Sequence, residues 1–253
     1  MARFARGIGD VDGCLTLAAC AERQARDDHE YDLAFLAACV PARMYLRRCE
    51  ADLAVAHYRN AHDLALCHGL AHRLGEVQHD LYISCRDAGN DTAALAYYGK
   101  ATECYLERSD PRIAGLLADR AEGRFMAVPS AETASAAMEH WRALPCTMPG
   151  IVERFFAGCN LMTAAAWLGS GKRYRDGLAM VEDAFPSLPS HEGAAAGLAD
   201  AATGALTAKD FPTGLRLSES ALSIARERGE AIVMQKALLA RDAALAEKVV
   251  RFT

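Results

Sequence analysis

The chain has 253 residues, of which 52% are hydrophobic and 24% charged, with a net charge of -5 and a pI near 5.9. This composition can bury a sizeable core, and the acidic balance argues against nucleic-acid binding, which normally requires a pI above about 9 or a dense basic stripe. The N-terminus lacks an apolar signal core, and the most apolar window, AGCNLMTAAAWLG, is too short to span a bilayer. We therefore expect a helical, globular, cytoplasmic protein that binds neither membranes nor nucleic acid.

Nine cysteines are spread through the helical patterns without any C-x-x-C pair. A free thiol in such a pattern behaves as a small hydrophobe, and an odd count without disulfide spacing is typical of a reducing compartment. Both features agree with a cytoplasmic location.

Small and bulky residues recur along the chain with a period of forty residues. In the segment GNDTAALAYYGKA, the loop Gly89-Asn90 precedes a predicted helix that carries Ala94, Tyr98 and Ala101 on one face. Six copies at a fixed period predict a solenoid. In chain order the other copies place on this face Cys14, Ala18 and Ala21; Ala54, Tyr58 and Ala61; Ala134, Met138 and Trp141; Gly177, Val181 and Ala184, three residues late; and Gly214, Ser218 and Ala221.

A second helical pattern lies between successive copies, so each repeat is predicted to be a helix pair. Pro41 falls inside one of these helices, which should therefore kink or start late, and Pro145 is interpreted as a loop residue. We expect about five and a half pairs in a single domain spanning residues 1–253. The second pattern covers residues 31–47, 71–87, 111–126, 151–169 and 193–208, and residues 230–252 form a C-terminal capping helix.

A glycine-containing turn followed by alanine, an aromatic residue and alanine resembles the tetratricopeptide repeat, and residues 89–101 carry the resemblance best. The forty-residue period is longer than the family's usual one and is similar to the helical-repeat arms of large bacterial signal-transducing regulators. The resemblance implies an all-α, right-handed superhelical solenoid whose first helices line a concave groove for a peptide or partner helix. Where the family often has tryptophan, leucine, glycine and tyrosine, this chain has Gln78, Leu81, Tyr82 and Cys85.

The family's inward-facing positions predict a groove that is charged at its N-terminal end and apolar at its C-terminal end. Arg43, Arg47 and Arg86 could hold a carboxylate or acidic side chain of a partner, since arginine binds such groups bidentately. Alternatively, they pair with Glu76, Asp87 and Asp119 as a solvated network. The charged end comprises Cys39, Arg43, Arg47, Glu76, His79, Ile83, Arg86, Asp87 and Asp119, and the apolar end Leu161, Ala165, Leu168, Ala196, Ala199 and Thr203.

Two constellations could carry chemistry. His72, Glu76 and His79 fall at i, i+4 and i+7 of a helical face, a set that zinc or iron accepts, but the spacing is not a standard zinc motif and we expect no metal or cofactor. Cys39, His79 and Asp119 would supply a nucleophile, a base and an orienting carboxylate only if folding brought them together. For this constellation we favour a buried, inert Cys39. We assign no catalytic residue.

These patterns favour a protein- or peptide-binding module in bacterial regulation or complex assembly over an enzyme. The alternative is a small-molecule sensor or an atypical enzyme with its site in the same groove. The chain begins inside the second helix of a repeat, so either it is a fragment of a larger regulator or a subunit covers its N-terminal edge. An uncapped solenoid end favours association, and a homodimer through that edge is what the second alternative predicts.

Overall fold

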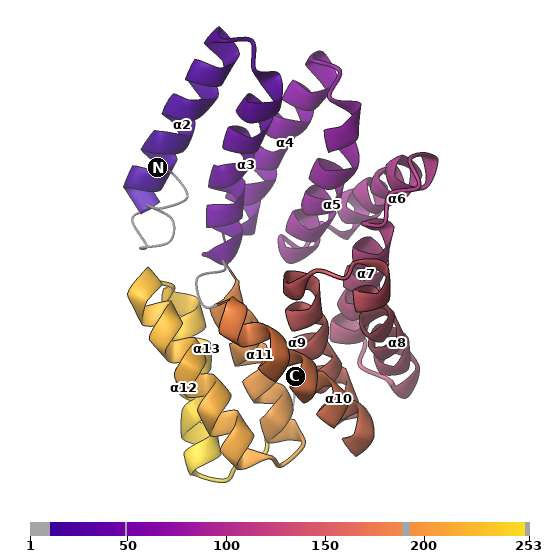
Figure 1. Cartoon of the computed structure of the whole chain (residues 1–253), viewed down its shortest axis with the longest axis vertical. Helices are drawn as coiled ribbons and strands as arrows, with labels where there is room; N and C mark the ends of the chain where they lie inside the picture. The colour runs from indigo at the N-terminus through magenta and orange to yellow at the C-terminus, as the bar shows by residue number, and fades with distance from the viewer. Residues whose placement is uncertain (1–10, 49, 189–192, 251–253) are drawn as a thin grey trace. The chain divides into compact units, whose positions relative to one another are not determined.

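The computed structural model describes residues 11–48, 50–188 and 193–250. These residues form twelve α-helices and one short 3₁₀-helix, and the described ranges contain no strand (Figure 1). Helices that follow one another in the chain pack together within each part of the array. The predicted all-α helical-repeat architecture is confirmed. No described helix is long and apolar enough to cross a membrane.

The helices keep the predicted order and spacing. In chain order they are α2 (Val11–Asp27), α3 (Tyr31–Arg47), α4 (Ala51–Cys67), α5 (Ala71–Asp87), α6 (Asp91–Glu107), α7 (Ile113–Ala127), α8 (Ala131–Thr147), α9 (Ile151–Trp167), α10 (Gly171–Ala184), η1 (Phe185–Ser187), α11 (Ala194–Thr207), α12 (Phe211–Arg228) and α13 (Ala231–Leu245).

The forty-residue period consists of two helix-turn units of twenty residues. Helices α2 to α6, α8 and α9 are each 17 residues long, and most are followed by a three-residue turn. The turns share a residue with positive φ twenty or a multiple of twenty residues apart, which ends the helix in a left-handed C-terminal cap. These residues are His29, Gly69, Gly89, Ser109, Gly169, Lys209 and Gly229.

The turn at Gly89 illustrates how this cap closes the helix. Gly89 has φ 73°, a conformation that glycine adopts without steric cost. The N–H of the next residue, Asn90, donates to the carbonyl of Cys85 at 2.8 Å, which satisfies a carbonyl that the helix leaves open. The Asn90 side chain then accepts from the N–H of Ala93 at 3.1 Å and caps α6. Because both signals are local, the sequence pattern located the turns correctly.

The predicted face of small and bulky residues is the buried face of its helix. Ala54, Tyr58 and Ala61 are all at most 1% exposed, and the other copies are buried or half-buried. Ala21 is the exception, since it is exposed on α2. Among the described residues, α2 packs mainly on α3, so less of its surface is covered than that of a helix inside the array.

Some predicted boundaries are wrong. Pro145 lies in the last turn of α8 instead of in a loop. Helix α3, in contrast, has the predicted bounds Tyr31–Arg47 and contains Pro41 without a late start. Helix α7 begins at Ile113, because the residues before it form a turn in which Asp110 accepts the N–H of Arg112 at 2.9 Å.

The expected capping helix is shorter than predicted. Helix α13 ends at Leu245 instead of residue 252, and residues 246–250 are not helical. The last residues of that prediction, 251 and 252, lie outside the described residues. Part of the N-terminal edge, through which a dimer is expected, also lies outside the described residues.

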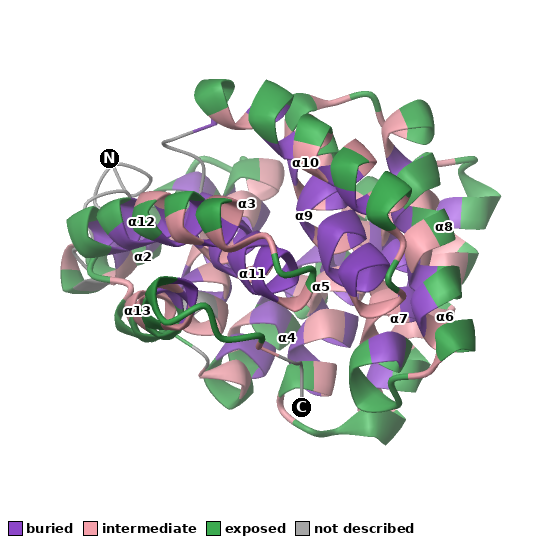
Figure 2. Cartoon of the chain, turned by 90° about the horizontal axis from the view of Figure 1, so that it is seen from below, coloured by how far each residue is buried: buried purple, intermediate pink, exposed green. Residues whose placement is uncertain are grey.

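The chain divides into two compact units, unit 1 (Met1–Leu116) and unit 2 (Leu117–Thr253). The core of unit 1 contains Phe35, Tyr58, Leu81, Tyr82 and Tyr105, together with alanines and cysteines of α3 to α6. The core of unit 2 is built mainly from α9 to α13. Figure 2 shows α9 and α11 buried over most of their surface, whereas most other helices bury one stripe.

In unit 2 the helices approach closely at glycines. A Cβ atom placed on Gly158 of α9 would lie 2.8 Å from the carbonyl oxygen of Gly177 on α10, and one on Gly177 would lie 2.9 Å from that of Gly158. Between α9 and α11, a Cβ on Gly204 would lie 3.1 Å from the backbone nitrogen of Thr163. Backbones meet at these points because a side chain is absent.

Candidate functional site

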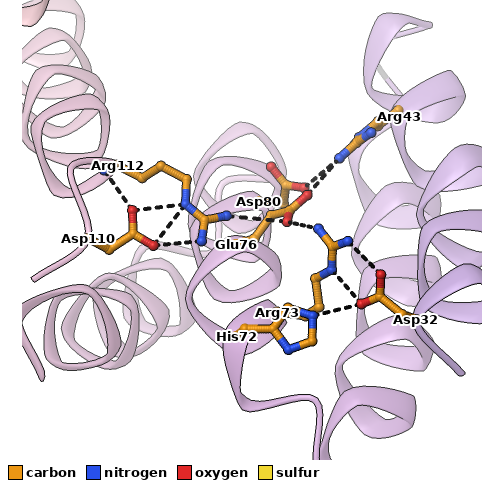
Figure 3. A network of polar contacts seen from close by, with 8 residues as sticks. All are labelled: Asp32, Arg43, His72, Arg73, Glu76, Asp80, Asp110 and Arg112. Carbon is orange, nitrogen blue, oxygen red and sulfur yellow. Dashed lines mark hydrogen bonds and ion pairs between the residues drawn. The ribbon is translucent and has the colours of Figure 1, made fainter. Parts of the chain in front are cut away.

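A network of charged side chains joins three segments of unit 1 (Figure 3). The segments are helix α3, helix α5 and the turn before helix α7. Helices α3, α5 and α7 recur about one forty-residue period apart, and we count them, with α9 and α11, as the first helices of their pairs. We call this set of side chains the arginine–carboxylate network, and it comprises Asp32 and Arg43 of α3, His72, Arg73, Glu76 and Asp80 of α5, and Asp110 and Arg112 of the turn.

The repeat itself brings the network together. Asp32, His72 and Arg112 follow one another at intervals of forty residues and thus occupy the same position of successive repeats, with Arg112 in the turn just before α7. His72 Nε2 lies 2.8 Å from Asp32 Oδ1. Equivalent positions of neighbouring repeats lie side by side in a solenoid, so opposite charges placed one period apart can pair.

Arg73 binds Asp32 through two hydrogen bonds. Its Nε donates to Asp32 Oδ1 at 2.9 Å and its Nη2 to Oδ2 at 2.8 Å, the bidentate geometry that makes arginine–carboxylate pairs strong. Hydrogen bonding from Arg73, assisted by His72, lowers the pKa of Asp32 to about 2. The guanidinium also lies over the ring of Phe35, 5.6 Å from its centroid, so its orientation is fixed from two sides.

Arg112 is held in the same manner at the other edge of the network. Its Nη2 donates to Asp110 Oδ2 at 2.6 Å and its Nε to both carboxylate oxygens at 3.0 Å. These bonds lower the pKa of Asp110. The guanidinium lies 5.4 Å from the ring centroid of Tyr105, which fixes it against the core.

Glu76 accepts hydrogen bonds from all three arginines. Its Oε1 accepts from Arg43 Nη2 at 3.2 Å, and its Oε2 accepts from Arg73 Nη1 at 3.1 Å and from Arg112 Nη1 at 3.4 Å. The Glu76 side chain is 20% exposed. The Glu76 carboxylate therefore connects α3, α5 and the turn before α7.

Asp80 lies one turn after Glu76 on α5 and is not satisfied in the same way. Its Oδ2 is 3.9 Å from Arg43 Nη2, is buried, and has no hydrogen-bond partner among the described residues. Burial raises the pKa of Asp80, and the nearby Arg43 opposes this shift. Burial and the charge of Asp80 also raise the pKa of Tyr58. The network thus holds four carboxyl groups against three guanidinium groups.

The residues predicted to line the charged end of the groove are only partly brought together. Arg43 meets Glu76 in the network, and Arg86 donates to its chain neighbour Asp87 at 2.9 Å. The internal-pairing interpretation names both carboxylates. His79 packs against the rings of Tyr82 and Tyr105, and Ile83 packs on the core of unit 1. Asp119 belongs to unit 2, and the side chain of Arg47 lies outside the described part of the chain.

Several predicted lining residues are core residues instead. Cys39 is fully buried, and burial raises its pKa well above the ordinary thiol value, which makes it a poor nucleophile. Leu161, Ala165 and Ala199 are also fully buried. Ala165 and Ala199 pack in the core of unit 2, because α9 and α11 contact each other directly. An apolar groove lining at these positions is therefore wrong.

The helical face that carries His72, Glu76 and His79 does exist, since α5 begins at Ala71. Its polar groups are used within the chain, because His72 contacts Asp32 and Glu76 contacts three arginines. Within residues 11–48, 50–188 and 193–250, no group of three or more His, Cys, Asp or Glu side chains is placed to hold a metal ion.

The sequence patterns did not indicate five members of the network, namely Asp32, Arg73, Asp80, Asp110 and Arg112. A usable signal was present in the charges: Asp32, His72 and Arg112 share one repeat position, and Arg73 follows directly. A search for opposite charges about one period apart would have found the pairs of Asp32.

No protein-family model matches this chain, and no curated protein matches it at a significant level.

Proposed function

We propose that this chain is a tetratricopeptide-like interaction module, a right-handed superhelix that binds a protein or peptide through the face formed by α3, α5 and the start of α7. The resemblance to the repeat arms of bacterial regulators suggests a role in bacterial regulation or complex assembly. The observation that supports this proposal best is the arginine–carboxylate network, which spans three successive repeats and is half-exposed.

The energetics of such a network favour a role in recognition. Partly buried ion pairs often contribute no more to stability than apolar residues of similar size would, whereas fixed charges give an interface its specificity and register. The side chains of Arg43, Arg73 and Arg112 are 31%, 22% and 36% exposed. A partner laid across the three repeats could therefore reach all three guanidinium groups.

Peptide selection tests this proposal. A random peptide library is selected on the full chain, and binding of the enriched peptides is compared with a double variant, Arg43→Ala/Arg73→Ala. We expect loss of binding by at least about tenfold, since each charged hydrogen bond contributes roughly 1.5–3 kcal/mol. The matched control is Arg142→Ala, which removes an exposed arginine paired with Glu139 on α8. Equal binding to the double variant and the control would contradict the proposed face.

One observation favours the alternative of a small-molecule site. The buried Oδ2 of Asp80 has unused hydrogen-bonding capacity beside Arg43, and a buried polar atom without a partner often has a functional role. Native mass spectrometry of the gently purified protein separates the two functions. A bound mass of a few hundred daltons that is lost in Asp80→Asn would support a small-molecule site, and a bound polypeptide would support the interaction module.

A further inference from the structure

We infer that Arg43, Arg73 and Arg112 form a carboxylate-binding site that Glu76 occupies in the ligand's place, and that an acidic group of a partner binds by displacing Glu76. This inference rests on the proposed function, because it names the chemical group that the same face takes. It differs from a simple acidic-partner preference, since the protein's own carboxylate competes for the site.

Arg73 and Arg112 each divide their hydrogen-bond donors between two carboxylates. Arg73 donates hydrogen bonds from Nε and Nη2 to Asp32, and Arg112 donates from Nε and Nη2 to Asp110. Each arginine then directs its remaining Nη1 at Glu76 Oε2. Because these contacts hold the two guanidinium groups independently of Glu76, their donors stay in position when Glu76 leaves.

The third donor completes the site from another helix. Arg43 of α3 donates through Nη2 to Glu76 Oε1, and the same nitrogen faces Asp80 Oδ2. Donors from α3, α5 and the turn before α7 thus converge on one carboxylate, each arginine through a single nitrogen, so that both carboxylate oxygens accept charge-assisted hydrogen bonds. Glu76 shows which chemical species the three donors fit.

Glu76 is held more weakly than Asp32 and Asp110, the carboxylates that hold the arginines in place. Its three hydrogen bonds measure 3.1–3.4 Å, whereas Arg112 holds Asp110 at 2.6–3.0 Å and Arg73 holds Asp32 at 2.8–2.9 Å. Charged hydrogen bonds of this kind are normally near 2.7–2.9 Å. The Glu76 side chain is 20% exposed, so rotation of its side chain can move the carboxylate into water.

The charge balance of the network favours the exchange of one carboxylate for another. Four carboxyl groups already face three guanidinium groups in the network, so an additional anion placed beside them would meet repulsion. Exchange of one carboxylate for another leaves the charge unchanged. If Glu76 occupies the site for about nine-tenths of the time, the apparent affinity of an external carboxylate is lowered about tenfold.

The test is isothermal titration of the full chain with glutarate, a small dicarboxylate. We compare the wild type with Glu76→Ala and with a matched control, Glu22→Ala, which removes a glutamate paired with Arg26 on α2 in the same unit. Glu76→Ala should bind glutarate at least about tenfold more tightly than both other proteins. If Glu76→Ala does not fold, Glu76→Gln, which keeps the shape and removes the charge, replaces it with the same expected direction.

Specificity is tested by inorganic phosphate in the same titrations. Weaker binding of phosphate than of glutarate to Glu76→Ala supports a carboxylate site. Equal binding of the two anions, or no difference between Glu76→Ala and Glu22→Ala, overturns the inference. These outcomes are separate from the peptide selection: failure to select any peptide contradicts the proposed function even where glutarate binds, and selected peptides do not rescue the inference when glutarate shows no difference.

Discussion

Unit 1 and unit 2 join successive first helices in two different ways. In unit 1, α3 and α5 are bridged by long side chains, as Arg73 of α5 reaches Asp32 and Arg43 of α3 reaches Glu76. In unit 2, α9 and α11 contact each other directly at small residues such as Gly204. Long charged side chains leave polar surface accessible between helices, and glycine and alanine remove that surface. One helical repeat can therefore provide either a recognition surface or a packed core.

A single repeat position shows the contrast. Glu76 lies in the centre of the charged network, and the position two periods later is held by Phe156. Phe156 packs on the core of unit 2, where its ring lies against Phe155. The same place on the helix carries a hydrogen-bond acceptor in one unit and an apolar contact in the other.

The largest expected effect is in the close packing of unit 2. We predict that Gly158→Val destabilises the protein by about 3 kcal/mol, because the new side chain meets the backbone of α10 and overpacking costs roughly 1–3 kcal/mol or more. The free energy of unfolding in urea measures the loss. Gly99→Ala is the control, since no atom lies within 4 Å of the added Cβ and alanine favours the helix by up to about 1 kcal/mol. Destabilisation by both variants would contradict the packing explanation.

The second prediction concerns the charged bridge of unit 1. Glu76→Ala removes the acceptor of three arginines and should destabilise the protein by about 2 kcal/mol, between the values for exposed and buried ion pairs. The difference from wild type should shrink in 1 M NaCl, because salt screens partly exposed charges. The Gly158→Val difference should not shrink. A salt-independent loss in Glu76→Ala would mean that Glu76 acts by packing.

The third prediction uses the pH dependence of Asp80. Its pKa is raised in the folded protein, so the ionised form costs stability at neutral pH, and the cost disappears as the pH falls below the ordinary value of 3.8. Asp80→Asn should therefore raise the melting temperature at pH 7, and this gain should vanish near pH 3. A lower melting temperature at pH 7 would show that the charge of Asp80 stabilises Arg43 instead.

The fourth prediction has the opposite sign in the same network. The pKa of Asp32 is lowered to about 2, so its charge stabilises the folded state above the ordinary value of 3.8, and this contribution is lost as the pH falls toward 2. Asp32→Asn should lower the melting temperature slightly at pH 7, and this difference should shrink as the pH falls through 2. The loss is small because the side chain is 40% exposed. A constant difference across this range would exclude an electrostatic role for Asp32.

Much of the fold could be predicted from the sequence, and less of the candidate site. The face Ala54, Tyr58 and Ala61 and the turn at Gly89 were correctly assigned, since side-chain spacing and a left-handed turn are properties of short segments. Cys39 and Ala165 were assigned to a groove and are buried, because burial depends on which neighbouring helix covers a face. That information lies outside the segment that carries the residue.

The sequence by itself determined the helices, their forty-residue period and the stripe that each helix buries, because these follow from hydrophobic periodicity and local capping. Only the tertiary structure decided which charges pair. Arg43 was expected to pair with carboxylates such as Glu76, but the convergence of Arg73 and Arg112 on the same carboxylate depends on distances between helices, which no single helix specifies. Ion pairs across repeats are set by packing, and packing is the property that a local pattern does not contain.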